Sequence, residues 1–315
     1  MTPGPWYGVS STSVLTDRLL VGLVLVSAAV LALVFGLMVL YLVRYRHNSP
    51  TIRGQIAEKT FRFEISWTIA TLVVFFGLFV WGSFIYVDLF QPPKNALKVY
   101  VVAKQWMWKV EYAGGQREID SLHVPVDKTI ELVMTSEDVI HDFFLPAFRL
   151  KRDVLPGQYE TLWFKAEKTG IYHLFCAQFC GTSHSAMIGT VEVMSGPDYA
   201  GWLARNGTSD TLAQQGQALF IRYGCDGCHG GHGTVRAPSL NGLYGSPVPL
   251  SDGTTTIADE RYIRDSILEP TKQVVASFQP VMPSFSGVIG EDDLVKLVAY
   301  VESLAANSQP GGNKP

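Results

Sequence analysis

One short stretch of the chain gathers four side chains that bind soft metal ions. Cys176, Cys180, His184 and Met187 follow one another at spacings of four, four and three residues. Such ligands suit copper, and mononuclear blue-copper sites use one Cys, two His and a weak Met. The second Cys changes that expectation, because two facing thiolates can bridge two copper ions that share one electron. His141, 35 residues upstream, can supply a second imidazole.

Two simpler interpretations of these residues remain open. Cys176 and Cys180 could form a disulfide, as extracytoplasmic proteins often do. They could also bind zinc, although Met is a poor zinc ligand and the usual finger spacing is absent. The register of His184 and Met187 with the two Cys favours binuclear copper over both.

A second cofactor motif lies nearer the C-terminus. Cys225, Cys228 and His229 form the C-x-x-C-H pattern of covalent c-type haem attachment. Alone, this pentapeptide is also compatible with a chance C-x-x-C or half of a zinc site. Met282 is the only Met after residue 194. A His/Met ligand pair raises the potential of a haem that transfers electrons, so Met282 is the candidate second axial ligand.

Two long apolar segments precede both motifs. Residues 19–43 and 65–87 contain no charge over 25 and 23 residues, and about 20 apolar residues span a bilayer. Because basic residues follow the first segment rather than precede it, a retained anchor is favoured over a signal peptide. A buried hairpin of a soluble protein is the alternative.

The loop between the apolar segments is predominantly basic. It carries Arg44, Arg46, Arg53, Lys59 and Arg62, against Glu58 and Glu64. The positive-inside rule therefore predicts a cytoplasmic loop, with the N-terminus and everything after Asp88 on the other side. That compartment suits c-type haem, which is attached outside the cytoplasm.

The remaining pattern predicts a β-rich part and a helical part. Short apolar runs at 97–102, 106–112, 130–134, 160–164 and 188–193, separated by turn formers, indicate a β-sandwich. Helices are expected around Trp202, around Gly216 and Phe220, and over residues 293–304. Residues 206–210 are a polar, turn-rich linker.

Residues 64–203 resemble subunit II of haem–copper cytochrome c oxidases, whose binuclear copper A centre has this ligand pattern. The resemblance implies bridging thiolates from Cys176 and Cys180 and terminal nitrogens from His141 and His184. It implies weak ligands from Met187 and from the backbone carbonyl of Gln178. The β-sandwich is then a cupredoxin-like Greek key.

The same resemblance implies roles for three further positions. Trp106 matches the tryptophan through which electrons enter copper A, whereas Trp108 is expected in the core. Glu64, in the family's E-x-x-W-T motif, matches a Glu near the mouth of a proton pathway, although the Pro that commonly follows is absent. Many members carry Glu at the position of Gln178, where it also reaches a magnesium ion. Because a neutral amide is a weaker ligand for a hard cation, the sequence does not establish magnesium.

Residues 211–306 resemble a small class I cytochrome c. The resemblance implies thioether bonds at Cys225 and Cys228, a proximal His229 held by the carbonyl of Pro238, and Met282 opposite. The fused haem resembles the caa-type oxidases. The expected organisation is an extracytoplasmic segment (1–18), a transmembrane hairpin (19–90), the copper A domain (91–204), a linker (205–210), the all-α cytochrome domain (211–306) and a disordered tail (307–315).

These features predict an electron-transfer subunit of a terminal oxidase in a bacterial inner membrane. Electrons from a soluble cytochrome c or a quinol-oxidising complex are expected to reach haem a and copper B of subunit I, beside subunit III and lipid. Oxygen reduction with proton translocation belongs to that partner. A net charge of −3 without a basic patch argues against nucleic acid.

Two other functions remain open from the sequence. The chain could be the copper A subunit of a nitric oxide reductase, or a membrane-tethered electron carrier without a catalytic partner. Nitrous oxide reductase shares the copper centre, but the large propeller domain that holds its catalytic cluster is missing here.

Overall fold

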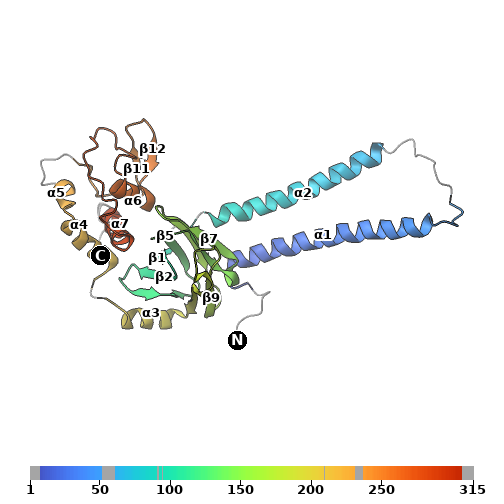
Figure 1. Cartoon of the computed structure of the whole chain (residues 1–315), viewed down its shortest axis with the longest axis horizontal. Coiled ribbons are helices and arrows are strands. Elements are labelled where there is room, and N and C mark those ends of the chain that lie inside the picture. Colours follow the sequence, from blue (N-terminus) through green and yellow to red (C-terminus); the bar gives the residue numbers. More distant parts are fainter. Residues whose placement is uncertain are drawn as a thin grey trace, which may run out of the picture.

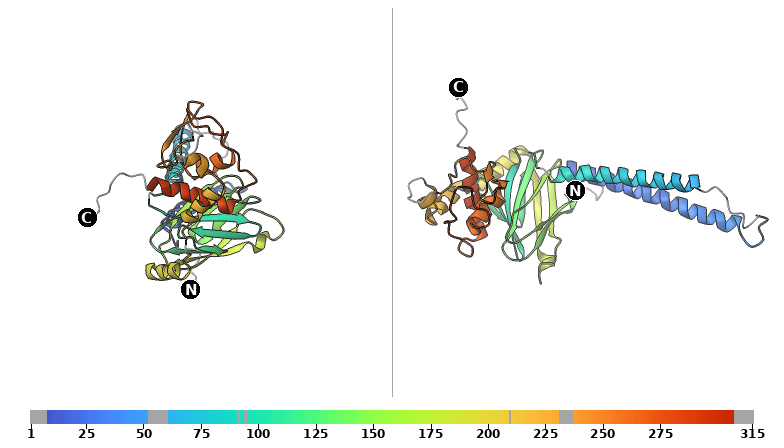
Figure 2. Two further views of the ribbon diagram at one scale, coloured as in Figure 1. Left: turned by 90° about the vertical axis from the view of Figure 1, so that its left-hand side faces the viewer. Right: turned by 90° about the horizontal axis from the view of Figure 1, so that it is seen from above.

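The computed structural model describes residues 8–51, 61–90, 92–93, 95–208, 210–230 and 237–306. It has three parts: a pair of long helices, a β-sandwich and a C-terminal helical unit (Figure 1). The helical pair extends from one side of the sandwich, and the C-terminal unit lies on the opposite side (Figure 2). Parts of the interhelical loop (52–60), the linker residue Ser209 and the expected tail (307–315) lie outside the described residues.

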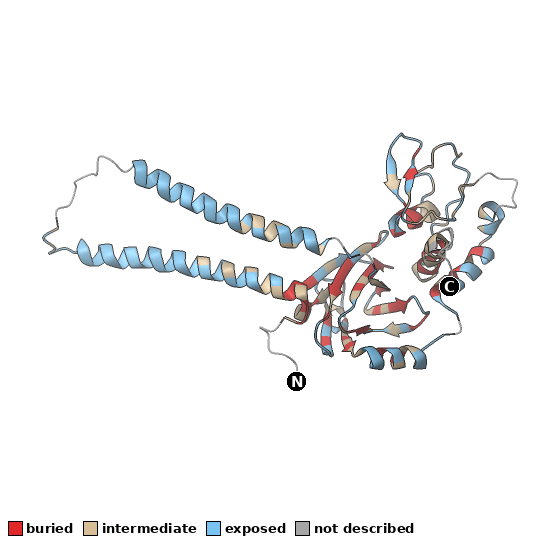
Figure 3. Ribbon diagram, turned by 180° about the vertical axis from the view of Figure 1, so that it is seen from behind, coloured by how far each residue is buried: buried red, intermediate tan, exposed pale blue. Residues whose placement is uncertain are grey.

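Helices α1 (Ser11–Arg44) and α2 (Phe61–Leu89) contain the two apolar segments. Ser10 caps α1 through a reciprocal capping box with Ser13, which satisfies otherwise unpaired amides of the first turn. Both helices are long and apolar enough to cross a membrane. The most apolar 18-residue stretch of each helix has no buried residue. Figure 3 shows this exposure along both helices. Exposed apolar surface of this extent is suited to lipid.

The sandwich consists of two five-stranded sheets, in the orders β3-β2-β1-β5-β8 and β4-β10-β9-β6-β7. Its strands are β1 (Leu97–Lys104), β2 (Met107–Tyr112), β3 (Arg117–Ile119), β4 (Ser121–Pro125), β5 (Thr129–Ser136), β6 (His141–Leu145), β7 (Leu150–Val154), β8 (Glu160–Lys165), β9 (Gly170–Cys176) and β10 (Ile188–Met194). β1 pairs in parallel with β5, and β4 with β10, whereas the other pairs are antiparallel. Two 3-10 turns, η1 (Pro146–Phe148) and η2 (His184–Ala186), interrupt the loops.

Alternate residues of the strands fill the space between the sheets. Val99, Val101 and Ala103 of β1 belong to this core. Trp108 is fully buried there and meets Phe143 edge-on, with ring centroids 5.1 Å apart. The expectation that Trp108 packs in the core is therefore confirmed. Helix α3 (Gly196–Arg205) closes the sandwich and follows a cap by Ser195.

The C-terminal unit is mainly helical. Its elements are α4 (Leu212–Arg222), α5 (Asp226–His229), β11 (Pro247–Pro249), β12 (Thr255–Ile257), α6 (Glu260–Leu268) and α7 (Glu291–Ala306). α4 crosses α7 closely at Gly216, where an added Cβ would lie 1.9 Å from the carbonyl oxygen of Lys296. This contact explains why the crossing requires glycine.

Candidate metal and haem sites

The fold brings the candidate copper ligands together at one end of the sandwich. His141 is the first residue of β6, and Cys176 is the last residue of β9. These strands are antiparallel neighbours, with Phe143 opposite Cys176. The loop after Cys176 contains Cys180, His184 and Met187. It passes through η2 and returns to β10, so these three residues lie beside His141 and Cys176.

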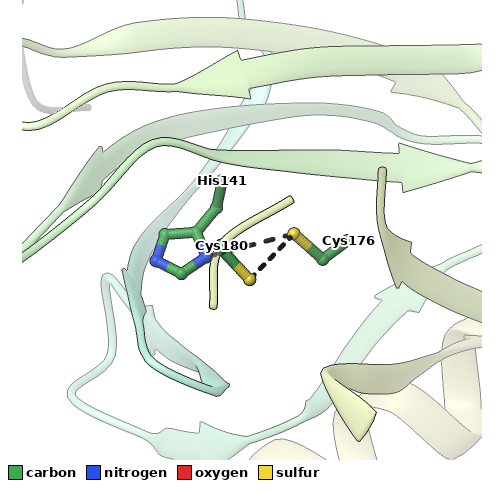
Figure 4. A group of neighbouring side chains, drawn as sticks. All are labelled: His141, Cys176 and Cys180. Atoms are coloured by element: carbon green, nitrogen blue, oxygen red, sulfur yellow. Dashed lines mark hydrogen bonds between the residues drawn. The ribbon is translucent and has the colours of Figure 1, made fainter. Parts of the chain in front are cut away.

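Six donor groups converge within hydrogen-bonding or contact distance: two thiols, two imidazoles, a thioether and a backbone carbonyl. The two sulfurs, Cys176 Sγ and Cys180 Sγ, lie 3.7 Å apart. Cys176 Sγ lies 4.0 Å from His141 Nδ1, and its thiol donates to Gln178 O at 3.2 Å. Cys180 Sγ lies 3.4 Å from His184 Nδ1 and 3.9 Å from Met187 Sδ. Figure 4 shows His141, Cys176 and Cys180 pointing toward one another.

This donor set fits copper better than the alternatives. A disulfide requires the sulfurs to be about 2.05 Å apart, whereas both cysteines here are free and separated by 3.7 Å. A thioether beside two thiols and two imidazoles is typical of copper rather than of structural zinc. The convergence of Gln178 O adds the backbone oxygen that the sequence resemblance implies.

The two thiols differ in acidity. Burial would raise the pKa of Cys176, but hydrogen bonds from His141 and neighbouring backbone groups lower it to about 7. Burial and the adjacent Cys176 raise the pKa of Cys180 to about 12. The pair therefore loses its first proton at Cys176, and a bound cation favours loss of both.

Asp138 orients the buried His141 ring. Its carboxylate accepts a hydrogen bond from His141 Nε2 at 2.9 Å and from the Gln105 amide at 2.8 Å. Burial would raise the pKa of Asp138, but these hydrogen bonds lower it. Nε2 is thereby occupied, and Nδ1 faces the sulfurs. The sequence does not single out Asp138, because only the fold brings its carboxylate to His141.

Trp106 lies at the tip of the β1–β2 hairpin against the Cys180 loop. It is half-buried, and a Cβ at Gly181 would lie 3.3 Å from its ring. The neighbouring Gln105 side chain donates to Cys180 O at 2.7 Å. The backbone of Gly181 has a φ of +119°, so this approach depends on glycine.

The C-x-x-C-H motif opens onto an apolar cavity of about 280 Å³. Cys225, Cys228 and His229 line it together with Met282. His229 Nδ1 donates to Pro238 O at 3.0 Å, which leaves Nε2 as the free ring nitrogen. An apolar cavity with two thiols, an imidazole and a thioether in its wall fits a covalently attached haem.

Comparisons with known proteins agree with both sites. Residues 116–194 match the family model for the periplasmic domain of cytochrome c oxidase subunit II. Residues 211–301 match the model for subunit III of cbb3-type cytochrome c oxidase. A cytochrome c oxidase subunit 2 from Cereibacter sphaeroides is 31% identical over 243 residues, which cover 59% of this chain and 75% of that protein. The chain belongs to the cytochrome c oxidase subunit II family.

Other subunit II proteins extend the similarity. Cytochrome c oxidase subunit 2 of Alkalihalophilus pseudofirmus is 28% identical over 300 residues, covering 89% of this chain and 84% of that protein. The crystal structure of the periplasmic domain of subunit II from Bradyrhizobium japonicum is 32% identical, covers 37% of this chain and 96% of that one, and has a TM-score of 0.36. Membership makes the chain a subunit of a haem–copper oxidase with a fused cytochrome c domain. The expected fold of apolar hairpin, cupredoxin-like sandwich and helical cytochrome domain is confirmed.

Proposed function

We propose that this subunit II receives electrons from an external donor and passes them to the haem–copper site of subunit I. When copper and haem are bound, each site would gain and lose one electron at a time. The observation that carries the proposal is the presence, in one chain, of the six-donor cluster and of the apolar cavity lined by Cys225, Cys228 and His229. The proposed order is donor, haem c, copper A and then the partner, where oxygen is reduced to water with proton translocation.

The residues of the copper site have distinct proposed roles. Cys176 and Cys180 would bridge the two metal ions, with His141 and His184 as terminal nitrogens. Met187 and the carbonyl of Gln178 would be weak ligands. Burial of His141, Cys176 and Cys180 keeps water away from the cluster, which limits the reorganisation of solvent that accompanies a change of charge.

The haem site has a similar division of roles. Cys225 and Cys228 would form the thioether bonds, while His229 and Met282 would bind iron from opposite sides. The hydrogen bond from His229 to Pro238 O holds the imidazole in one orientation.

The membrane helices supply the proposed location and partner surface. We propose that α1 and α2 span a bacterial inner membrane with the sandwich and the cytochrome unit on the periplasmic side. Arg44, Arg46 and Arg62 flank the helices at the end away from the sandwich, and Arg53 and Lys59 lie outside the described residues. The same helices would contact subunit I, with subunit III and lipid nearby. Glu64 is exposed in the first turn of α2, where it could meet a proton pathway of subunit I; magnesium at Gln178 is not part of the proposal.

The deciding experiment is gas consumption by the complex purified through this chain with a reduced artificial donor. Rapid oxygen uptake with little turnover of nitric oxide supports the proposal. Rapid loss of nitric oxide with feeble oxygen uptake would assign the complex to nitric oxide reduction. Intact cofactors without turnover of either gas or a retained partner would indicate a tethered electron carrier.

The ligand assignment has its own test. Cys180→Ser should abolish the mixed-valence copper signal in electron paramagnetic resonance, because one bridging sulfur is lost. Persistence of that signal would contradict bridging by Cys180.

A further inference from the structure

The outer face of the sandwich is covered by the C-terminal unit of the same chain. Tyr100, Val102 and Val133 project from β1 and β5 away from the sandwich core, yet each is at most 2% exposed. They share one hydrophobic cluster with residues of the C-terminal unit, including Val295 and Val298 of α7. Figure 2 shows α7 lying against this sheet. The two units therefore meet through a continuous apolar interface rather than through the linker alone.

One lysine occupies the centre of the polar contacts in this interface. Lys98 of β1 lies 2.5 Å from Glu260 of α6 and 2.7 Å from Glu302 of α7. Its ammonium also donates to the hydroxyl of Tyr244 at 3.0 Å. Lys98 thus joins the copper domain to three separate places in the cytochrome unit.

Tyrosines complete the hydrogen bonds of both carboxylates. Tyr244 donates to Glu260 at 2.6 Å, and Tyr100 donates to Glu302 at 3.1 Å. Burial alone would lower the pKa of Lys98, but Glu260 and Glu302 raise it well above its usual range. Burial alone would raise the pKa of Glu260, but Lys98 holds it below its usual value. Lys98 and Glu260 therefore stay charged near neutral pH.

Two further contacts lie at other places on the interface. Lys109 of β2 reaches Asp292 at the start of α7, 3.1 Å away, and Glu137 at 2.5 Å. Glu137 precedes Asp138, the residue that holds His141. Arg264 of α6 donates to Gly157 O in the sandwich and pairs with Glu291. Contacts at three separated places restrict rotation as well as separation of the two units.

We propose that the copper domain and the cytochrome unit form one rigid electron-transfer body, held in a single orientation by Lys98 between Glu260 and Glu302. Relative domain motion is the ordinary expectation for domains in one chain unless the interface is extensive and apolar. Here the apolar cluster supplies contact area, and the ion pairs specify orientation, a role attested for buried polar groups in some proteins. The inference rests on the proposed function, because an electron given up at one site is the electron gained at the other. It adds that this transfer requires no movement of the domains.

The test separates the two units while they remain in the full complex. A protease recognition sequence is inserted between Asn206 and Thr211, the membranes are treated with the protease, and covalent haem that sediments with the membrane is measured. The wild-type cytochrome unit should stay bound after cleavage. Lys98→Met should weaken its retention by roughly a hundredfold, because removing one partner leaves two carboxylates in the interface.

A matched control tests whether the loss of retention is specific to Lys98 or follows from the loss of any ion-paired lysine. Lys272, whose side chain is 47% exposed, forms a 2.8 Å ion pair with Asp265 inside the cytochrome unit and is not part of the Lys98 cluster. Lys272→Met should therefore leave retention unchanged. If Lys98→Met fails to incorporate haem, Glu302→Gln provides a milder change at the same cluster. Release of the wild-type unit after cleavage, or full retention in Lys98→Met and Glu302→Gln, would overturn the proposal.

A kinetic measurement tests rigidity directly. After flash reduction of the intact wild-type chain, electron redistribution between the two sites should be independent of solvent viscosity. A rate that falls in proportion to added glycerol would show that domain motion controls the transfer and would refute a rigid body. The retention assay needs no turnover, so a retained unit without oxygen uptake would count against the proposed function alone.

Discussion

At the scale of single residues, Asp138 determines which ring nitrogen of His141 faces the sulfurs. Its carboxylate accepts from both His141 Nε2 and the Gln105 amide. Asp138→Asn replaces one of these acceptor oxygens with an NH2 group, which cannot accept. Loss of such an outer partner typically costs about 10–100-fold in metal affinity, so copper affinity should fall within that range. Competitive titration with a copper chelator measures it; Asp198→Asn, in the exposed first turn of α3, should have no effect, and unchanged affinity in Asp138→Asn would exclude the orienting role.

Met282 is the residue whose removal tests the haem assignment. It lines the same cavity as Cys225 and His229. Because a Met ligand raises the potential of a His-ligated haem, Met282→Ala should lower the haem potential while leaving the covalent attachment intact. A redox titration of the haem absorbance measures this shift. An unchanged potential would mean that another side chain binds iron.

At the scale of secondary structure, the α4–α7 crossing depends on Gly216. An alanine there improves helix propensity by up to about 1 kcal/mol. Its Cβ, however, would collide with Lys296 O at 1.9 Å, and overpacking of this kind costs about 1–3 kcal/mol. Gly216→Ala should therefore lower the thermal midpoint of the cytochrome unit, followed at the haem band. Gly196→Ala on α3, where no atom lies within 4 Å, is the control and should not lower stability; equal behaviour of both variants would contradict the argument.

Hydrophobic periodicity predicted five of the ten sandwich strands and missed the other five. The apolar runs anticipated β1, β2, β5, β8 and β10, as well as α4 and α7. β3 has only three residues, and β4, β6, β7 and β9 lie outside the apolar runs that the sequence marks. The candidate ligand residues stand out in the sequence because their types and spacing are specific, and the fold brings them together. Asp138 does not stand out, since its role depends on a bend that returns its carboxylate to His141.

The domain interface was the largest feature that the sequence did not disclose. Residues 99–103 are apolar without alternation, which is typical of a strand buried on both faces. The sequence therefore indicates that both faces of β1 are buried. It does not indicate which part of the chain covers the outer face. The partner residues Glu260 and Glu302 lie more than 160 residues away along the chain, so only the fold brings them to Lys98.

At the scale of the whole molecule, the interface should be insensitive to pH near neutrality and should weaken in acid. The folded pKa of Glu260 lies below 4.5 and that of Lys98 above 10.5, so the pair contributes between those values and is lost outside them. Burial raises the pKa of Glu131, which lies opposite Lys98 on β5. As the pH falls, Glu131 is therefore protonated before Glu260, and its repulsion of Glu260 and Glu302 is removed. In the linker-cleavage assay, retention should hold from about pH 9 to about pH 5 and fall below about pH 4. Glu260→Gln should weaken that fall; a loss between pH 7 and pH 5 would contradict the assignment.

The proposed contact between the cytochrome unit and the copper domain also predicts where electrons enter the molecule. If the proposed order is correct, an external donor reduces the cytochrome unit, and Trp106 is not on the route. Trp106→Phe preserves most of the packing against Gly181, so it changes the indole with little damage to the copper loop. Oxygen uptake with the external donor should then remain close to that of the wild type. A large loss of turnover, with the copper signal and haem potential unchanged, would contradict the bypass of Trp106.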